Sequence, residues 1–159
     1  AYINYPGTRD VQYGEGIFVG YRYYEKKDLA PLFPFGHGLS YTRFEYSDLH
    51  TPAAAKVGSS IPVNLVVRNS GDTAGKEIVQ VYVRDLVSSL IRPIKELKGF
   101  SKVDLQPGQS TQVSFELDPR AFAYFDPYKY QWVVEPGEFE IMVGSSSQDV
   151  RLSGRVNLE

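Results

Sequence analysis

The feature that most constrains the fold is an alternation of apolar and polar side chains, with a period of two, within residues 44–159. Apolar side chains take every second position in four segments: residues 63–68, 79–83, 111–117 and 139–143. Such alternation indicates strands with one buried face and one face in water. Turn-forming residues separate the segments at roughly ten-residue spacing, as in two-layered antiparallel structures. The sequence therefore predicts an all-β fold, an antiparallel β-sandwich, with Phe115 in its core.

Residues 1–43 lack this periodicity and form an irregular N-terminal extension. Aromatic residues, glycines and prolines follow one another there without a helical pattern. We expect short extended stretches around Tyr13 and in residues 17–24, and no helix. The chain opens at Ala1 instead of a methionine, so we expect it to be cut from something longer.

The composition narrows the class of protein. Hydrophobic residues make up 42% of 159 residues, which is enough for one folded domain with a core. The net charge of −2 argues against nucleic acid as a partner, because such binders need a basic excess. No apolar run reaches the ~20 residues of a membrane-spanning helix, so we expect no membrane partner. Without cysteine, a disulfide framework and a thiolate metal site are excluded.

Two further features each have two interpretations. Trp132, the only tryptophan, stands before a Pro-Gly turn, where a core or sheet-packing residue is more common than a platform for a sugar ring. Five basic residues gather near Asp85 and Glu96: Arg84, Arg92, Lys95, Lys98 and Lys102. We favour a solvated strand edge guarded by charge over a site for an anionic or domain partner.

The irregular extension carries a resemblance to a known family. Residues 14–24 read Gly-Glu-Gly-Ile-Phe-Val-Gly-Tyr-Arg-Tyr-Tyr, and residues 34–42 read Pro-Phe-Gly-His-Gly-Leu-Ser-Tyr-Thr. They resemble the junction in glycoside hydrolase family 3 β-glucosidases where the second catalytic domain meets a C-terminal fibronectin type III-like domain. The β-xylosidase branch shares the second motif, whereas the first is more similar to the β-glucosidase branch. Further motifs resemble this family in the same order: residues 67–71, 75–82, 92–103 and 136–147.

The resemblance implies an immunoglobulin- or fibronectin type III-like sandwich over residues 44–159. It also implies that residues 1–43, here called the connector, lead from a preceding catalytic domain. The parent would be a secreted or periplasmic β-glucosidase that hydrolyses terminal β-D-glucosyl residues, and its upstream catalytic domains would be the partner of this chain. We expect the connector to fold back partly over the sandwich. The candidates for packing between domains are Glu15, Tyr21, Arg22, Phe33, Phe35 and His37.

Catalytic chemistry is expected to lie outside this chain. Glycoside hydrolysis uses two carboxyl groups placed across a sugar, and the resemblance puts both the catalytic Asp and the acid/base Glu upstream. Glu15 stands in an apolar context, but a carboxylate held by backbone or arginine hydrogen bonds, with Arg22 as a natural partner, fits better than a catalytic one. His37 and His50 lack triad or metal-ligand spacing. We therefore expect no catalytic residue, no cofactor and no metal site.

The sequence is compatible with three functions. The first is a non-catalytic structural domain that packs on the catalytic domains and stabilises them. The second is a binding module that attaches the enzyme to polysaccharide or lignin-like surfaces through exposed aromatic side chains. An independent adhesion-type sandwich is the third, and it leaves the connector without a purpose.

Overall fold

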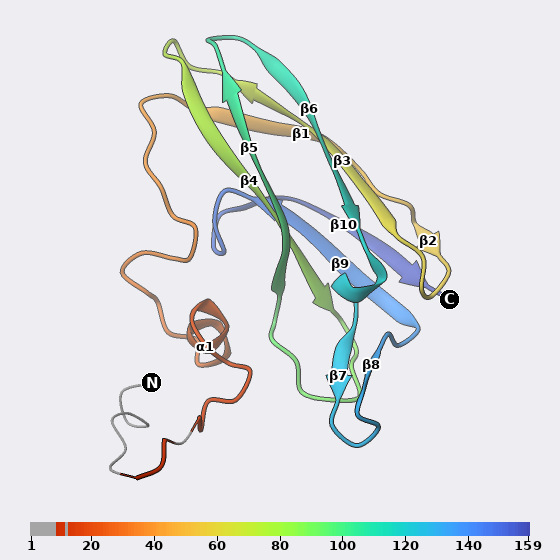
Figure 1. The fold of residues 1–159 in the computed structure, drawn as a ribbon. Coiled ribbons are helices and arrows are strands. Elements are labelled where there is room, and N and C mark those ends of the chain that lie inside the picture. Colours follow the sequence, from red (N-terminus) through yellow and green to blue (C-terminus); the bar gives the residue numbers. More distant parts are fainter. Residues whose placement is uncertain (1–8, 12) are drawn as a thin grey trace.

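A computed structural model describes residues 9–11 and 13–159, which form two packed β-sheets with a small hairpin at one end (Figure 1). The elements are α1 (Tyr21–Lys26), β1 (Phe44–His50), β2 (Ala54–Ala55), β3 (Ile61–Asn69), β4 (Gly75–Asp85), β5 (Glu96–Leu105), β6 (Ser110–Leu117), the 3-10 turn η2 (Pro119–Ala121), β7 (Tyr124–Asp126), β8 (Gln131–Val133), β9 (Gly137–Gly144) and β10 (Val150–Leu158). One sheet has the order β1-β3-β6, the other β2-β10-β9-β4-β5, and β7 pairs with β8. Among the strands of the described residues, only the short β2–β10 pairing is parallel. The predicted all-β sandwich is confirmed.

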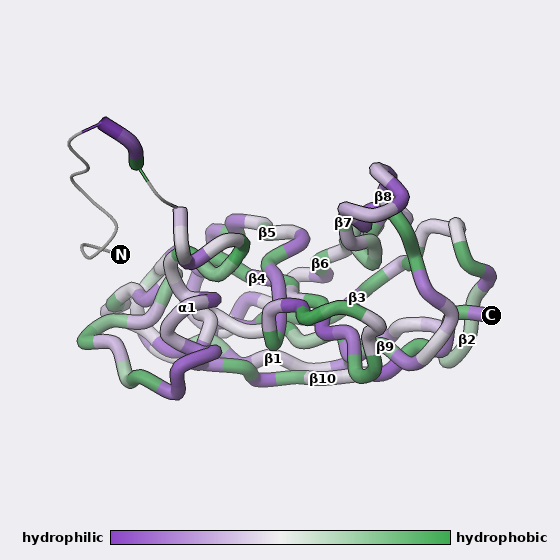
Figure 2. Tube along the Cα trace, turned by 90° about the horizontal axis from the view of Figure 1, so that it is seen from below, coloured by the Kyte–Doolittle hydropathy of each residue, from purple (hydrophilic) through white to green (hydrophobic). Residues whose placement is uncertain are grey.

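The core lies between the two sheets, and the alternation in the sequence creates it. In β3 the odd positions, Ile61 to Val67, are fully buried, and in β9 the same holds for Phe139, Ile141 and Val143. In Figure 2 the tube along the strands changes between green (hydrophobic) and purple (hydrophilic) residues. Phe115 is only partly buried, although it packs against the core as expected.

Strand β4 departs from the rule of one buried and one wet face. Val79, Val81 and Val83 face the core, as the alternation predicts. Gln80 and Tyr82 point to the opposite face and are also buried. The expectation of a solvated outer face is wrong here, because the connector covers it.

The described part of the connector, residues 9–11 and 13–43, runs along the outer side of the five-stranded sheet before β1 begins at Phe44 (Figure 1). Residues 1–8 and residue 12 of the predicted connector lie outside the described residues. The expectation of no helix is wrong, because Tyr21–Lys26 form α1. Six residues are too few for a helix that is stable by itself, so contacts with the sheet must hold it.

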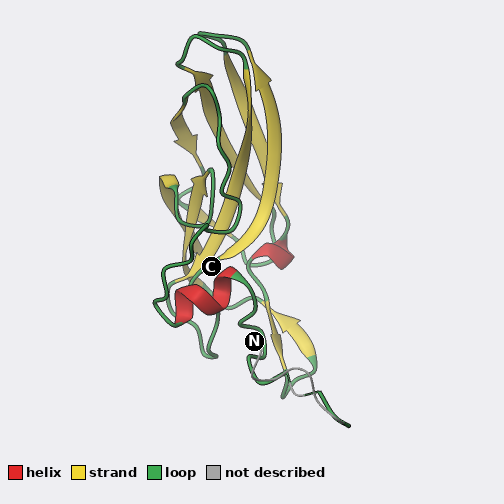
Figure 3. Ribbon diagram, turned by 90° about the vertical axis from the view of Figure 1, so that its left-hand side faces the viewer, coloured by secondary structure: helices red, strands yellow, loops and turns green. Residues whose placement is uncertain are grey.

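Trp132 is not a core residue. It lies in β8 with half of its surface exposed (50%), and it packs on Phe125 of β7 at 5.7 Å between ring centres. Trp132 therefore packs within the small β7–β8 hairpin and not against either of the two main sheets. Figure 3 shows this hairpin extending beyond the end of the sandwich. Across residues 9–11 and 13–159, no helix has the length and apolar character needed to cross a membrane.

Candidate functional site

The connector meets the outer face of β4 and β5 along a contact that we call the seam. At its centre Tyr21 stacks on Phe35 with 5.0 Å between ring centres, and its ring edge meets Tyr82 at 6.0 Å. The Tyr21 hydroxyl oxygen accepts a hydrogen bond from the Leu97 backbone N–H at 2.8 Å. Tyr21 thus contacts the buried Tyr82 of the sandwich, while Phe35, which is half-exposed, stacks on Tyr21. Burial raises the pKa of Tyr82, which keeps its hydroxyl protonated as a donor.

The second part of the seam is a close approach at Gly36. Its positive φ of 82° suits glycine, and a Cβ there would collide with the side-chain amide of Gln80. Both polar atoms of the Gln80 side-chain amide are hydrogen-bonded. Its nitrogen donates to the Ser145 carbonyl at 2.5 Å, and its oxygen accepts from the Tyr82 hydroxyl at 2.5 Å. The Phe35 carbonyl accepts from the Ser147 N–H at 2.8 Å. The connector is therefore held by backbone as well as by side chains.

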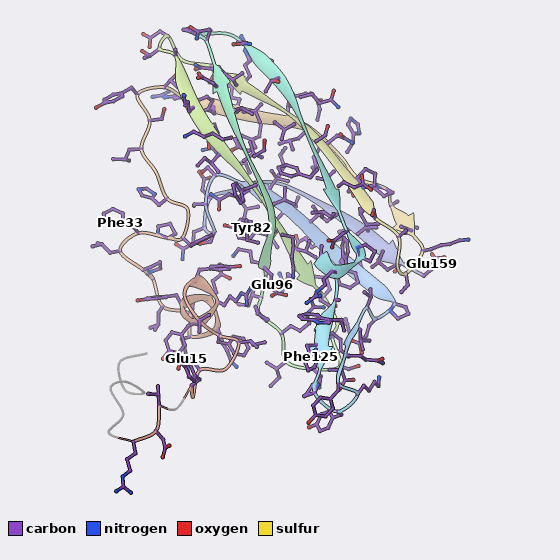
Figure 4. All side chains as sticks on the ribbon, viewed as in Figure 1. Glu15, Phe33, Tyr82, Glu96, Phe125 and Glu159 are labelled. Carbon is purple, nitrogen blue, oxygen red and sulfur yellow. The ribbon has the colours of Figure 1, made fainter. Side chains whose placement is uncertain are left out.

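Ion pairs form the third part of the seam. Arg22 of α1 pairs with Glu96 at 3.2 Å, and Glu25 of α1 pairs with Lys95. Both cross from the connector to the start of β5 or the loop before it. Figure 4 places Glu96 and Tyr82 between the connector and the body of the sandwich. The carboxylate that holds Arg22 in this structure is thus Glu96.

Arg92 connects this seam to the base of the β7–β8 hairpin. Its guanidinium contacts Asp85 at 2.9 Å and Glu96 at 3.3 Å, and it donates to the carbonyls of Phe122 and Ala123 at 3.0 and 3.3 Å. Burial raises the pKa of Asp85, while the nearby guanidinium opposes that rise. The three groups form one buried cluster with satisfied hydrogen bonds.

The predicted solvated strand edge is wrong for most of the basic residues. The side chains of Arg92, Lys95 and Lys98 are largely buried, and each has a carboxylate partner. Burial lowers the pKa of Lys98 even though Glu96 lies 3.4 Å away. Two residues fit the original interpretation: Arg84 is half-exposed and pairs with Glu140 at 3.6 Å, and Lys102 is exposed. The buried basic side chains do not form a solvated strand edge, because α1 and the base of the hairpin cover them.

The remaining predicted packing residues do not join the seam contacts described above. Phe33 and His37 stack on each other at 5.4 Å and are exposed. Figure 4 shows Phe33 on the side of the connector that faces away from the sandwich. Glu15 is half-buried in a turn in which its carbonyl accepts from the Phe18 N–H at 3.0 Å. The structure thus unites Tyr21, Arg22 and Phe35.

Sequence reasoning missed the residues on the sandwich side of the seam, namely Gln80, Tyr82 and Leu97. A polar Gln80 between two valines has the pattern of a solvated position. The excess of aromatic residues in the connector was the one sequence feature that indicated a covered surface on the sandwich, because so many aromatic side chains require a surface to pack against.

A cleft of about 850 Å³ is lined by the end of the connector, the first residues of β1 and parts of β4 and β10. The residues that line the cleft include Tyr46, whose hydroxyl donates to Glu77 at 3.1 Å, and Arg151, which lies over the Tyr46 ring at 4.8 Å. Burial raises the pKa of Glu77, and Tyr46 and Arg151 oppose the rise. In the part of the chain that the structure describes, no three acidic or histidine side chains gather as metal ligands would.

Comparison with known proteins explains why a connector and a sandwich occur together. Residues 77–147 match the model of the fibronectin type III-like domain family. The thermostable β-glucosidase B of Acetivibrio thermocellus is 56% identical over 99% of this chain, and the probable β-glucosidase K of Emericella nidulans is 48% identical over 99%. This chain holds a fibronectin type III-like domain of the family 3 β-glucosidases.

The three-dimensional fold of this chain is also similar to that of solved β-glucosidase structures. A family 3 β-glucosidase from Bifidobacterium adolescentis matches 98% of the chain with a TM-score of 0.93 and 44% identity. β-Glucosidase 3B from Thermotoga neapolitana matches 98% with a TM-score of 0.90 and 40% identity. Because both matches include nearly all of the connector, the likeness covers connector and sandwich together.

The Fn3-like chain corresponds to a small part of these enzymes. It spans about a fifth of the length of the curated relatives it matches, 21% and 18% in the two named above. It covers 23% of the Bifidobacterium chain.

Proposed function

We propose that this chain is the non-catalytic C-terminal part of a β-glucosidase that hydrolyses terminal β-D-glucosyl residues. In this proposal the sandwich packs on the upstream catalytic domains and stabilises them. The seam is the observation that supports it: a segment that would otherwise be a free linker is tied to β4 and β5 by ring stacking, backbone hydrogen bonds and two ion pairs. The connector is thereby held against the sandwich from Tyr21 to Phe35.

The charged groups of the seam serve this structural role. Glu96 is surrounded by Arg22, Arg92 and Lys98, and Asp85 is held by Arg92. A catalytic acid or base must instead be able to exchange its proton with a substrate. These carboxylates act as counter-ions, and the active-site carboxyl pair belongs to the upstream part.

The proposal is tested in the full-length parent with Phe35→Ala. Loss of the Tyr21 stack should lower the melting temperature of the parent and leave KM for an aryl-β-glucoside unchanged. Leu39→Ala is the matched control, because Leu39 is an exposed connector side chain. A large rise in KM at unchanged melting temperature would place Phe35 at a sugar site instead. The isolated chain should show no turnover, and turnover that Glu15→Gln abolishes would contradict the proposal.

Attachment to polysaccharide is the second candidate, and one observation favours it. The β7–β8 hairpin exposes Trp132 and Phe125 beside two further tyrosines, and aromatic faces can stack on sugar rings. Binding of the parent to insoluble cellulose, lost in Trp132→Ala, would support this candidate. The secreted or periplasmic location stays a prediction, which fractionation of the source cells would test.

A further inference from the structure

The β7–β8 hairpin exposes more aromatic surface than a free protein surface usually carries. Trp132 and Phe125 are about half exposed, while Tyr128 and Tyr130 are 86% and 83% exposed. All four lie within eight residues of one another in the sequence, on an element that extends beyond both sheets (Figures 1 and 3). Gathered exposed apolar groups mark interaction sites more often than scattered ones do.

The hairpin is nevertheless held firmly at its base and turn. Asp126 is buried and accepts from the backbone N–H groups of Tyr128 and Lys129 at 2.8 and 3.1 Å. Arg120 lies over the Trp132 ring at 3.8 Å, and Phe125 meets the ring edge-on. The side chains of Trp132 and Phe125 are thus held in place before any partner arrives, which lowers the entropy cost of binding.

Tyr130 adopts a backbone conformation that a tyrosine rarely takes. Its φ is +52°, in the left-handed region where glycine is the favoured residue. The turn would form with less strain if residue 130 were glycine, yet a bulky, largely exposed aromatic residue stands there. Strain of this kind is found where function requires a particular side chain.

The loop between β4 and β5, residues 86–95, extends the exposed surface next to the hairpin. Glu135, beside the hairpin, accepts from the Ser89 N–H at 3.0 Å and from the Tyr124 hydroxyl at 2.9 Å. The same loop presents Val87 and Ile91, which are 83% and 76% exposed. Branched aliphatic side chains offer no flat face to a sugar ring, but they fit a protein surface.

We propose that the β7–β8 hairpin and residues 86–91 form one docking face for the catalytic part that precedes this chain in the parent β-glucosidase. The inference rests on the function proposed above. In the relatives about four-fifths of the polypeptide lies outside the matched part. Figure 4 labels Glu15 and Phe125 at the same end of the molecule, and in Figure 2 the described start of the connector and the hairpin project to the same side. The first described residues of the connector, which the preceding domains would adjoin, therefore lie toward the end where this face is exposed.

The seam and the docking face have separate tasks in this proposal. The seam joins connector to sandwich within the chain, through Tyr21, Arg22 and Phe35. The docking face contacts the catalytic part directly, through side chains that touch little of their own sandwich. Removing such a side chain should therefore weaken the parent and leave the 159-residue chain intact.

The experiment compares Trp132→Ala, Ile91→Ala and Tyr130→Gly in the parent and in the 159-residue chain. In the parent we expect protease cleavage in the connector to rise about tenfold, as for loss of a central interface residue. In the chain alone, Trp132→Ala and Ile91→Ala should leave the melting temperature nearly unchanged. Tyr130→Gly should leave it unchanged or raise it, because the strain is relieved. Phe100→Ala, at an exposed aromatic residue on β5, is the matched control and should change neither readout.

Two results would overturn the docking face. One is parental cleavage that stays at the wild-type rate in all three variants. The other is a parent that binds cellulose and loses binding in Trp132→Ala while cleavage is unchanged, which would assign the hairpin to a carbohydrate surface. A parent lacking residues 44–159 separates the two proposals. If that deletion destabilises the enzyme and the hairpin variants do not, the proposed function stands and the docking face falls.

Discussion

The core of the sandwich and the seam hold the same strand, β4, from opposite faces and by different means. On the inner side Val79, Val81 and Val83 lie in a continuous apolar core. On the outer side Gln80 and Tyr82 are buried, and a few specific contacts with Gly36 and Tyr21 cover them. The core depends on total buried area, whereas the seam depends on individual pairs. Substitutions in the two regions should therefore differ in kind as well as in size.

The largest effect is expected from Phe139→Ala in the core. Phe139 is fully buried, and its ring meets Phe122 edge-on at 5.3 Å. Such a truncation costs about 3–5 kcal/mol, a large share of the roughly 5–15 kcal/mol that stabilises a domain. Urea unfolding of the 159-residue chain measures the loss.

Phe115→Ala sharpens this prediction. The alternation places Phe115 in the core, but the side chain is only partly buried. Its loss should therefore destabilise the domain less than that of Phe139. Equal losses at the two positions would show that the exposed rim of the sandwich is as tightly packed as its centre.

The second largest effect is expected from Arg92→Ala, between the seam and the hairpin base. The substitution leaves Asp85 and Glu96 buried without this cation, and breaking a buried ion pair in this way costs about 3 kcal/mol. Thermal unfolding should show the loss, and amide exchange should show α1 and the hairpin loosening together. Arg84→Ala is the control, because Arg84 is half-exposed and its pair with Glu140 is long. A similar loss in both variants would contradict the assignment of Arg92 to a buried cluster.

The contrast between core and seam also explains what the sequence could predict. The strands and the core follow from local alternation, which requires only that one face be buried. The burial of Gln80, Lys95 and Lys98 depends on a segment more than forty residues away in the sequence, so no local pattern reveals it. The helix α1 was missed for the same reason, because tertiary contacts stabilise six residues that would not form a helix alone.

The candidate site was predicted in part. The excess of aromatic residues in the connector made Tyr21, Phe33 and Phe35 candidates for packing between domains, which stays a prediction. Within this chain Tyr21 and Phe35 stack in the seam, and the sequence could not separate them from Phe33, which faces away. Arg22 was expected as a partner for the Glu15 carboxylate, and in the structure it pairs with Glu96 at 3.2 Å. Trp132 was misplaced because a Pro-Gly turn does not tell whether the preceding strand belongs to a main sheet or to a separate hairpin.

A smaller, pH-dependent effect is expected from Glu77→Gln on the inner side of β4. Burial raises the pKa of Glu77 above its ordinary value of 4.5. The fold thus favours the protonated form, and this contribution to stability is complete below pH 4.5 and lost as pH rises through the folded-state pKa. Gln is neutral and can still accept from the Tyr46 hydroxyl. The variant should therefore melt higher than wild type at pH 7 and nearly equally at pH 4. Glu45→Gln, at an exposed position of β1, should change little at either pH, and a Glu77→Gln protein that melts lower at pH 7 would show that the carboxylate is needed as an anion.

The smallest effect is expected from Tyr21→Phe, which tests whether the seam can open while the core stays folded. The variant keeps the stack on Phe35 and the edge contact with Tyr82, and it removes only the oxygen that accepts from the Leu97 N–H at 2.8 Å. One lost hydrogen bond is worth about 1 kcal/mol, or about fivefold in a local opening equilibrium. Amide exchange at Leu97 should accelerate by that factor while the melting temperature of the sandwich hardly moves, since the core contacts of β4 are untouched. Tyr23→Phe removes a hydroxyl from the same helix and should leave Leu97 exchange as in wild type. If Tyr21→Phe instead lowered the melting temperature as far as a core truncation does, the seam and the core would be one cooperative unit, and the difference between the two faces of β4 would be one of composition alone.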